Sequence, residues 1–190
     1  MQIARQMILI GNDDGKKMVE REEASRFLYE YTHVTGIDIE LIAVGERPDF
    51  ACEREGQRYG LELVKVTQNP EIRRAKEMLG EDTHFYGGDA AWMVQQAVYA
   101  KEEKRSSANW TYPDSTILVL QLVGGDGEEL MEHLDEQLMD EMSETGFCEI
   151  WIADDSTVGP YDNVQLIGIK PKQWRSLHRH SSYGKKEYDY

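Results

Sequence analysis

Apolar and polar positions alternate in three neighbouring segments of the first half of the chain. Residues 37–44 alternate and then become apolar, which predicts a strand. Residues 43–55 have the composition of a strand that ends in charge, residues 53–58 have the composition of a turn, and residues 61–66 have the composition of a second strand. The pattern therefore predicts a β-hairpin whose second strand is 61–66.

Helical spacing and long apolar runs define the other elements. Apolar residues recur at helical spacing in four segments, 16–35, 71–79, 89–105 and 128–144. Near-continuous apolar runs predict strands at 116–123, 147–154 and 164–169, the first of them a central strand covered on both faces. A short strand is predicted at 7–10, with Asp13 or Asp14 as the N-cap of the first helix. This order predicts an α/β fold, a mixed central β-sheet flanked by helices.

The length and composition of the chain indicate how many domains it forms and in which cellular compartment it is expected. The chain has 190 residues, of which 40% are hydrophobic and 30% charged, enough for one packed domain, which we place at residues 1–169. It contains no apolar run of 18 residues, so we expect a cytoplasmic protein without a membrane partner. Cys52 and Cys148 are far apart, which suits a reducing compartment and excludes a disulfide framework.

The charge is unevenly distributed. The formal net charge of −15 disfavours a simple nucleic-acid binder, because affinity for phosphates comes largely from lysine and arginine. Residues 170–190 nevertheless carry a net +4, which leaves −19 on residues 1–169. With Trp174 and Tyr183 among its cations, this basic C-terminal tail would contact a nucleic acid or neutralise the acidic body.

Two acids in the hairpin are the leading candidates for chemistry. Strand alternation turns Leu61, Leu63 and Lys65 to one face and places Glu62 on the other, between apolar neighbours. An unpaired buried charge costs several kcal/mol, so Glu62 needs a cation. A divalent metal held by Glu62 and by Asp49, on the adjacent strand, would satisfy both acids. The alternative is that these acids meet solvent or an arginine.

The segment Pro48-Asp49-Phe50, followed by Gly60-Leu61-Glu62-Leu63 and by a helix, strand, helix and strand, resembles the PD-(D/E)xK nuclease superfamily. It is similar in particular to bacterial domains in which an "RPDF" strand precedes a "GxEVT"-like strand. The resemblance covers roughly residues 20 to 170. It implies a restriction-endonuclease-like core, with Asp49 and Glu62 matching the two acids that bind Mg²⁺ or Mn²⁺.

The lysine of that motif is displaced here. The superfamily pattern puts lysine two residues after the second acid, a position that Val64 occupies, and Lys65 follows it on the opposite face. Lys65 would reach Glu62 only through a bulge. Because some members of the superfamily supply the lysine from the following helix, Lys76 and Lys101 are further candidates.

The first helix adds another acid. Glu23 and Glu20 lie on its apolar side, and in nuclease-like folds this helix often lends a glutamate to the metal site. Glu23 is therefore the predicted third ligand of the metal, and Glu20 is its substitute. The alternative is that acids occur in these first turns only because the helix dipole favours negative charge there.

Other candidates have weaker signals. His84 lies in a loop where a general base or a substrate contact would be possible, and Gln96 with Lys101 would reach a phosphate from the helix 89–105. The loop 124–127 is rich in glycine but lacks the Gly-Lys-Ser/Thr ending of a P-loop and carries an acid, which favours a simple strand-to-helix connection.

Two functions follow from these residues. The first is a Mg²⁺-dependent endonuclease whose substrate is nucleic acid, DNA rather than RNA, with Asp49, Glu62, Lys65 and Glu23 as its site residues. The second is an inactive nuclease-fold protein whose acidic surface binds a protein partner or forms a homodimer. A metal within the pair Asp49 and Glu62 favours the first, whereas a salt bridge from Arg47 or Lys65 over these acids favours the second.

Overall fold

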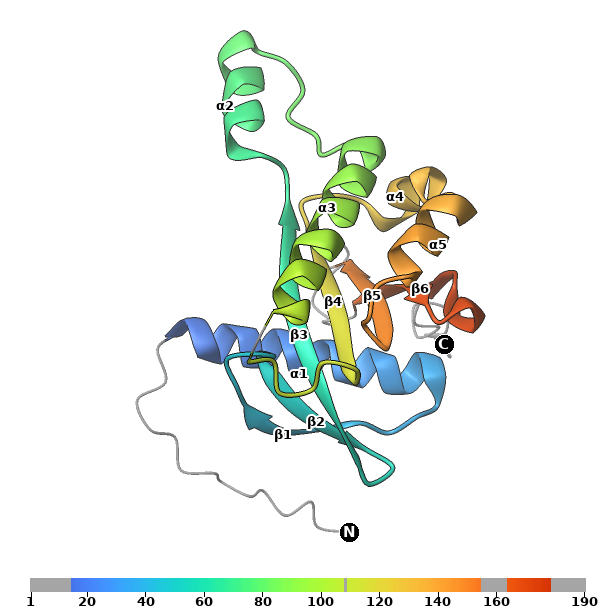
Figure 1. Ribbon diagram of the computed structural model, residues 1–190. Helices are drawn as coiled ribbons and strands as arrows, with labels where there is room; N and C mark the ends of the chain where they lie inside the picture. The colour runs from blue at the N-terminus through green and yellow to red at the C-terminus, as the bar shows by residue number, and fades with distance from the viewer. Residues whose placement is uncertain (1–14, 108, 155–163, 179–190) are drawn as a thin grey trace, which may run out of the picture.

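The computed structural model describes residues 15–107, 109–154 and 164–178, and its elements follow the predicted order (Figure 1). Its helices are α1 (Gly15–Thr35), α2 (Pro70–Leu79), α3 (Gly87–Ser106), α4 (Gly127–His133), α5 (Glu136–Ser143) and the short 3₁₀ helix η1 (Lys172–Trp174). Its strands are β1 (Glu40–Val44), β2 (Phe50–Arg54), β3 (Gln57–Thr67), β4 (Thr116–Val123), β5 (Glu149–Asp154), β6 (Gln165–Lys170) and β7 (Leu177–His178). The strand predicted at 7–10, the cap at Asp13 or Asp14 and the end of the basic tail lie outside the described residues.

The strands form one mixed sheet in the order β1-β2-β3-β4-β5-β6-β7. β2 and β3 form the predicted hairpin and are antiparallel, with Phe50 opposite Leu61. The strand predicted over residues 43–55 is not continuous, because β1 ends at Val44 and β2 begins at Phe50. β4 pairs in parallel with both β3 and β5 and is buried along all but its last residue. The predictions of an α/β fold with a mixed central sheet, and of a central strand at 116–123, are therefore confirmed.

Helices cover the two faces of this sheet (Figure 1). On one face α1 buries Ala24, Phe27 and Tyr31 against β3, β4 and β5. On the other face α3, α4 and α5 pack on the alternate residues of the same strands, among them Leu118 and Leu120. The sheet is thus the middle layer of three, and the two faces of β3 meet different helices.

The structure corrects one predicted helix. The segment 128–144 was predicted as a single helix, but α4 and α5 are separate. Leu134 ends α4 and is buried, and the side chain of Asp135 accepts a hydrogen bond from the backbone N–H of Leu138, which makes Asp135 the N-cap of α5. An aspartate that caps the next turn competes with continuation of the helix.

The sheet continues past residue 169, where the predicted domain ends. β6 runs to Lys170, and η1 and β7 follow it, with β7 paired to β6. Gly168 allows this return to pack closely, since a Cβ at that position would lie 2.1 Å from the carbonyl oxygen of Trp174. The first part of the basic segment therefore belongs to the folded body.

Both cysteines are free thiols, as expected without a disulfide framework. Burial raises the pKa of Cys52 and of Cys148 to about 12, so both remain protonated at neutral pH. None of the described helices has both the length and the apolar character needed to cross a membrane.

A buried ion pair joins β2 and β5 beneath α1. Arg54 of β2 pairs with Glu149 of β5, and the Tyr31 hydroxyl hydrogen-bonds to both side chains. The indole N–H of Trp151 donates to the second carboxylate oxygen of Glu149 at 2.9 Å. All four side chains thus belong to one network around a buried carboxylate.

Arg54→Met is expected to lower the free energy of unfolding by about 3–5 kcal/mol, because it leaves Glu149 buried without its cation. Chemical denaturation measures this change. Arg73→Met is the matched control, since Arg73 and Glu77 form an exposed ion pair on α2 and its loss costs at most about 1 kcal/mol. Equal effects of the two substitutions would contradict the assignment.

Candidate functional site

Asp49 lies where β2 leaves β3. The ladder between these strands begins with Phe50 opposite Leu61. Beyond that pair, β2 no longer pairs with β3. The backbone N–H of Leu63 instead donates to Oδ2 of Asp49 at 2.9 Å, so this carboxylate takes the place of a backbone carbonyl of β2. Gly60 fixes this approach, because a Cβ there would lie 2.5 Å from Cγ of Pro48. Pro48 can therefore pack on β3 and direct Asp49 toward Leu63.

Glu62 lies beside Asp49 on the face of β3 that meets α3. It is 4% exposed, and its Oε2 accepts a hydrogen bond from the backbone N–H of Asp49 at 3.1 Å. Its Oε1 forms an ion pair with Nζ of Lys101, which comes from α3. Glu62 thus has the cation that its burial requires, and the cation comes from Lys101 instead of Arg47 or Lys65.

The site carries more negative than positive charge. Burial, and after it the neighbouring carboxylate of Glu62, raise the pKa of Asp49 to about 6. The hydrogen bond from Leu63 and the charge of Lys101 oppose this shift, while the charge of Glu20 adds to it. Two other acids and one ammonium group therefore act on Asp49, an arrangement that favours binding of a cation.

The carboxylate oxygens suit a divalent metal ion. Oδ1 of Asp49 has no hydrogen-bond partner within the described residues. Mg²⁺ commonly binds through one or two carboxylates together with waters and substrate phosphates. Residues 15–107, 109–154 and 164–178 hold no cluster of three or more His, Cys, Asp or Glu side chains arranged for a metal. An ion here would use Asp49 and Glu62 with water, carbonyl or phosphate oxygens.

Lys65 and Glu23 lie on the opposite face of the sheet from Glu62. β3 alternates without a bulge toward β4, so Lys65 faces α1, where it pairs with Glu23 at 2.7 Å. The structure therefore turns Lys65 away from Glu62, as strand alternation predicts. Of the two acids considered on α1, Glu20 is the one whose charge acts on Asp49. The roles predicted for Lys65 and Glu23 in metal catalysis stay predictions.

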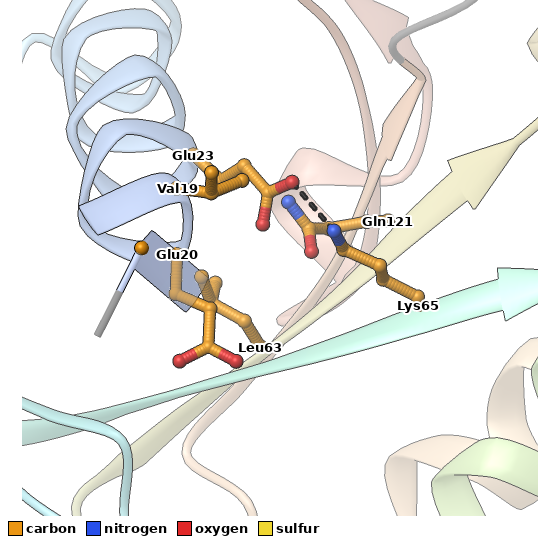
Figure 2. A pocket seen from close by; sticks show the side chains of 7 residues that line it. Val19, Glu20, Glu23, Leu63, Lys65 and Gln121 are labelled. Carbon is orange, nitrogen blue, oxygen red and sulfur yellow. Dashed lines mark ion pairs between the residues drawn. The ribbon is translucent and has the colours of Figure 1, made fainter. Parts of the chain in front are cut away.

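A cavity lies next to the candidate metal site at Asp49, on the face of the sheet that meets α1. Its volume is about 520 Å³, and its polar lining consists of Glu20, Glu23, Lys65 and Gln121. Figure 2 shows Glu23, Lys65 and Gln121 converging from α1, β3 and β4, with Glu20 directed toward Leu63. Leu63 links the two features, because its backbone binds Asp49 while its side chain lines the cavity.

Three other candidates lie away from Asp49 and Glu62 in their contacts, and two of them have partners of their own. His84 hydrogen-bonds to Glu129 at 2.7 Å, an interaction that raises the pKa of His84 on the surface. Lys76 lies 5.2 Å from the ring centre of Tyr86, which leaves Lys101 as the cation paired with Glu62. Gln96 is exposed on α3.

The glycine-rich loop before α4 contains its own acceptors. The backbone N–H of Gly127 donates to Oδ2 of Asp154 at 2.8 Å, and Asp126 accepts from the N–H groups of Glu128 and Glu129. The amides that would bind a phosphate are thus used by carboxylates. The structure agrees with the prediction of a strand-to-helix connection.

Gln121 is the residue of this region that sequence reasoning passed over. It is the one polar side chain in the interior of β4, and it is 4% exposed at the wall of the cavity. The sequence does contain a signal for it, a single amide side chain inside a strongly apolar strand. Such a residue is expected to be buried, and a buried polar group needs a hydrogen-bond partner.

Comparison of the chain with models of protein families, with curated proteins and with solved structures finds no match in any of the three. The functional interpretation therefore depends on the geometry of the Asp49 site and on the motif in the sequence.

The raised pKa of Asp49 predicts a pH-dependent stability. The protonated acid contributes stability that is fully present below the unfolded value of 3.8 and is lost as the pH rises through about 6. In EDTA, the free energy of unfolding of the wild type should fall by roughly 1–3 kcal/mol relative to Asp49→Asn between pH 4 and pH 7. Urea denaturation across this range measures the difference, and parallel curves for the two proteins would contradict it.

Proposed function

We propose that the protein is a metal-dependent phosphodiesterase that cleaves nucleic acid, DNA in preference to RNA, at the Asp49 site. The observation that carries this proposal is the half-buried Asp49 carboxylate, which lies beside Glu62 within the field of Glu20 and has a pKa of about 6. Such an excess of buried negative charge is a common way to create a binding site for Mg²⁺ or Mn²⁺.

The residues around Asp49 have distinct roles in this proposal. A bound divalent ion would supply an activated water and would stabilise charge on the phosphate. Asp49 and Glu62 would hold the ion, and the backbone N–H groups of Leu63 and Asp49 fix the orientation of the two carboxylates. Lys101 places a positive charge beside Glu62, where it can stabilise negative charge that develops on a phosphodiester.

The order of elements supports a restriction-endonuclease-like core. A helix carrying acids, the hairpin with Asp49 and Glu62, a long helix, and then strand, helix and strand occur as the resemblance implies. Lys101 lies on the long helix α3, the element from which some members of that superfamily supply their lysine. The acidic body favours a substrate held by few phosphate contacts.

The test is cleavage of supercoiled plasmid, single-stranded DNA and RNA in Mg²⁺ or Mn²⁺, with EDTA as the blank. The wild type should cut DNA only with metal, and Glu62→Gln should be inactive. Glu40→Gln, which changes an exposed glutamate on β1, should behave as the wild type. An absence of metal-dependent cleavage on all three substrates would refute the proposal.

A second candidate function is a nuclease-fold binding protein without catalysis. It is favoured by the ion pair between Glu62 and Lys101, which already compensates the more deeply buried acid without a metal. The net charge of −19 on residues 1–169 would then serve to attract a basic protein partner. This protein would bind no divalent ion at Asp49, so metal binding separates the two functions.

A further inference from the structure

The cavity between α1 and the sheet contains polar atoms that have no hydrogen-bond partner among the described residues. Gln121 is 4% exposed and makes no hydrogen bond within the described residues. The side chain of Glu23 is 10% exposed, and its Oε2 is buried without a hydrogen-bond partner, although Oε1 pairs with Lys65. Buried polar groups are nearly always satisfied, so a buried carboxylate oxygen without a partner, beside an amide that lines the same cavity and makes no hydrogen bond in the described part of the chain, favours a ligand there.

The polar groups define what the ligand must offer. Oε2 of Glu23 can only accept a hydrogen bond, Nζ of Lys65 can only donate, and the amide of Gln121 can do both. Figure 2 shows these three side chains directed toward one another. The complementary ligand therefore has an amino donor beside a carbonyl acceptor on one edge.

We propose that this cavity binds a single nucleobase of the substrate, one with an amino group and a carbonyl group, as guanine and cytosine have. Adenine lacks the carbonyl group, and thymine offers its ring N3–H in place of an exocyclic amino group with two N–H donors. The cavity volume of about 520 Å³ lies within the range of sites for small ligands, and Val19 with Leu63 provides aliphatic surface for the base. Glu23 accepts from the amino group, while Lys65 and Gln121 donate to the carbonyl oxygen.

The cavity adjoins the proposed centre of cleavage. Leu63 and Glu20 line it, and the same two residues interact with Asp49 through a hydrogen bond and through charge. A base in the cavity would bring its own backbone phosphate toward Asp49, as expected when a base leaves the stack or the strand is single. The inference rests on the proposed function and gives Glu23 and Lys65 a substrate-binding role within it.

The experiment is an NMR titration of the intact protein in EDTA with dGMP, dCMP, dAMP, dTMP and inorganic phosphate. The probe is the side-chain amide signal of Gln121, identified by its absence in Gln121→Met. We expect dGMP and dCMP to shift this signal and to bind about tenfold or more tightly than dAMP and dTMP. Because no metal is present, binding is independent of whether the protein cleaves DNA.

Variants test the groups that make the contact. Glu23→Gln should weaken dGMP binding by about tenfold or more, because it removes the acceptor for the amino group. Glu77→Gln is the matched control, since Glu77 also pairs with a cation, Arg73, but lies on the exposed helix α2. Lys65→Met, at a half-exposed side chain, replaces Glu23→Gln if the spectrum of that variant shows misfolding.

Each outcome has a defined consequence. Equal shifts with all four nucleotides, shifts with phosphate alone or no shift at all would overturn base recognition, even if metal-dependent cleavage is found. A preference for dGMP and dCMP that Glu23→Gln removes would support it. The same preference in a protein that cuts no substrate would leave the cavity as a base-binding site and refute only the cleavage function.

Discussion

Asp49→Asn is expected to lower metal-dependent cleavage of DNA by at least about 100-fold. Loss of a residue that merely orients a metal ligand typically costs 10–100-fold, so loss of a ligand's charge costs more. Asparagine retains an oxygen that can accept the N–H of Leu63, so the edge of β3 keeps its partner. In EDTA at pH 7 the variant should be at least as stable as the wild type, because the repulsion with Glu62 is removed. Cleavage rates and urea denaturation of the same preparation measure both effects.

Asp38→Asn is the matched control for this substitution. Asp38 is exposed before β1, so its variant loses the same charge without touching the site. It should retain wild-type cleavage. A variant of Asp49 that cuts DNA as fast as Asp38→Asn does would contradict the assignment of Asp49 as a ligand.

Lys101→Met should affect stability and cleavage together. Without the ammonium group Glu62 is left buried and unpaired, which is expected to cost about 3–5 kcal/mol in EDTA. A divalent ion bound beside Glu62 replaces the lost positive charge, so Mg²⁺ or Mn²⁺ should restore more stability to this variant than to the wild type. Cleavage with saturating metal should still fall by about 100-fold or more, since a positioned lysine contributes on this scale.

Lys104→Met separates this effect from a general loss of charge on α3. Lys104 is exposed on the same helix, and its variant should keep both stability and cleavage. If Lys101→Met is destabilised and metals restore nothing, Lys101 acts only as the structural partner of Glu62. That result would favour the function without catalysis.

The sequence predicts most of the elements because their signals are local. Alternation defines the hairpin that carries Asp49 and Glu62, and the apolar run of β4 identifies the central strand. The same alternation separates Lys65 from Glu62 onto opposite faces, which the structure bears out. A period of two residues in a strand is sufficient for these conclusions.

For contacts between distant segments, the sequence limits the number of candidate residues but does not identify which of them makes the contact. Lys76 and Lys101 were both open as partners of Glu62, and the packing of α3 on β3 decides in favour of Lys101. The role of the polar Gln121 could not be predicted, because it depends on the cavity between α1 and β4. The break between α4 and α5 depends on Asp135 accepting a backbone hydrogen bond, which competes with a helical pattern that otherwise continues.

Binding of Mn²⁺, measured by electron paramagnetic resonance, tests most directly whether Asp49 and Glu62 form a metal site. The wild type should show a saturable site that is lost in Asp49→Asn and in Glu62→Gln and retained in Asp38→Asn. Its affinity should fall as the pH is lowered through about 6, because protons compete for Asp49. Absence of saturable binding, or binding that both site variants retain, would contradict the metal site and the cleavage function that depends on it.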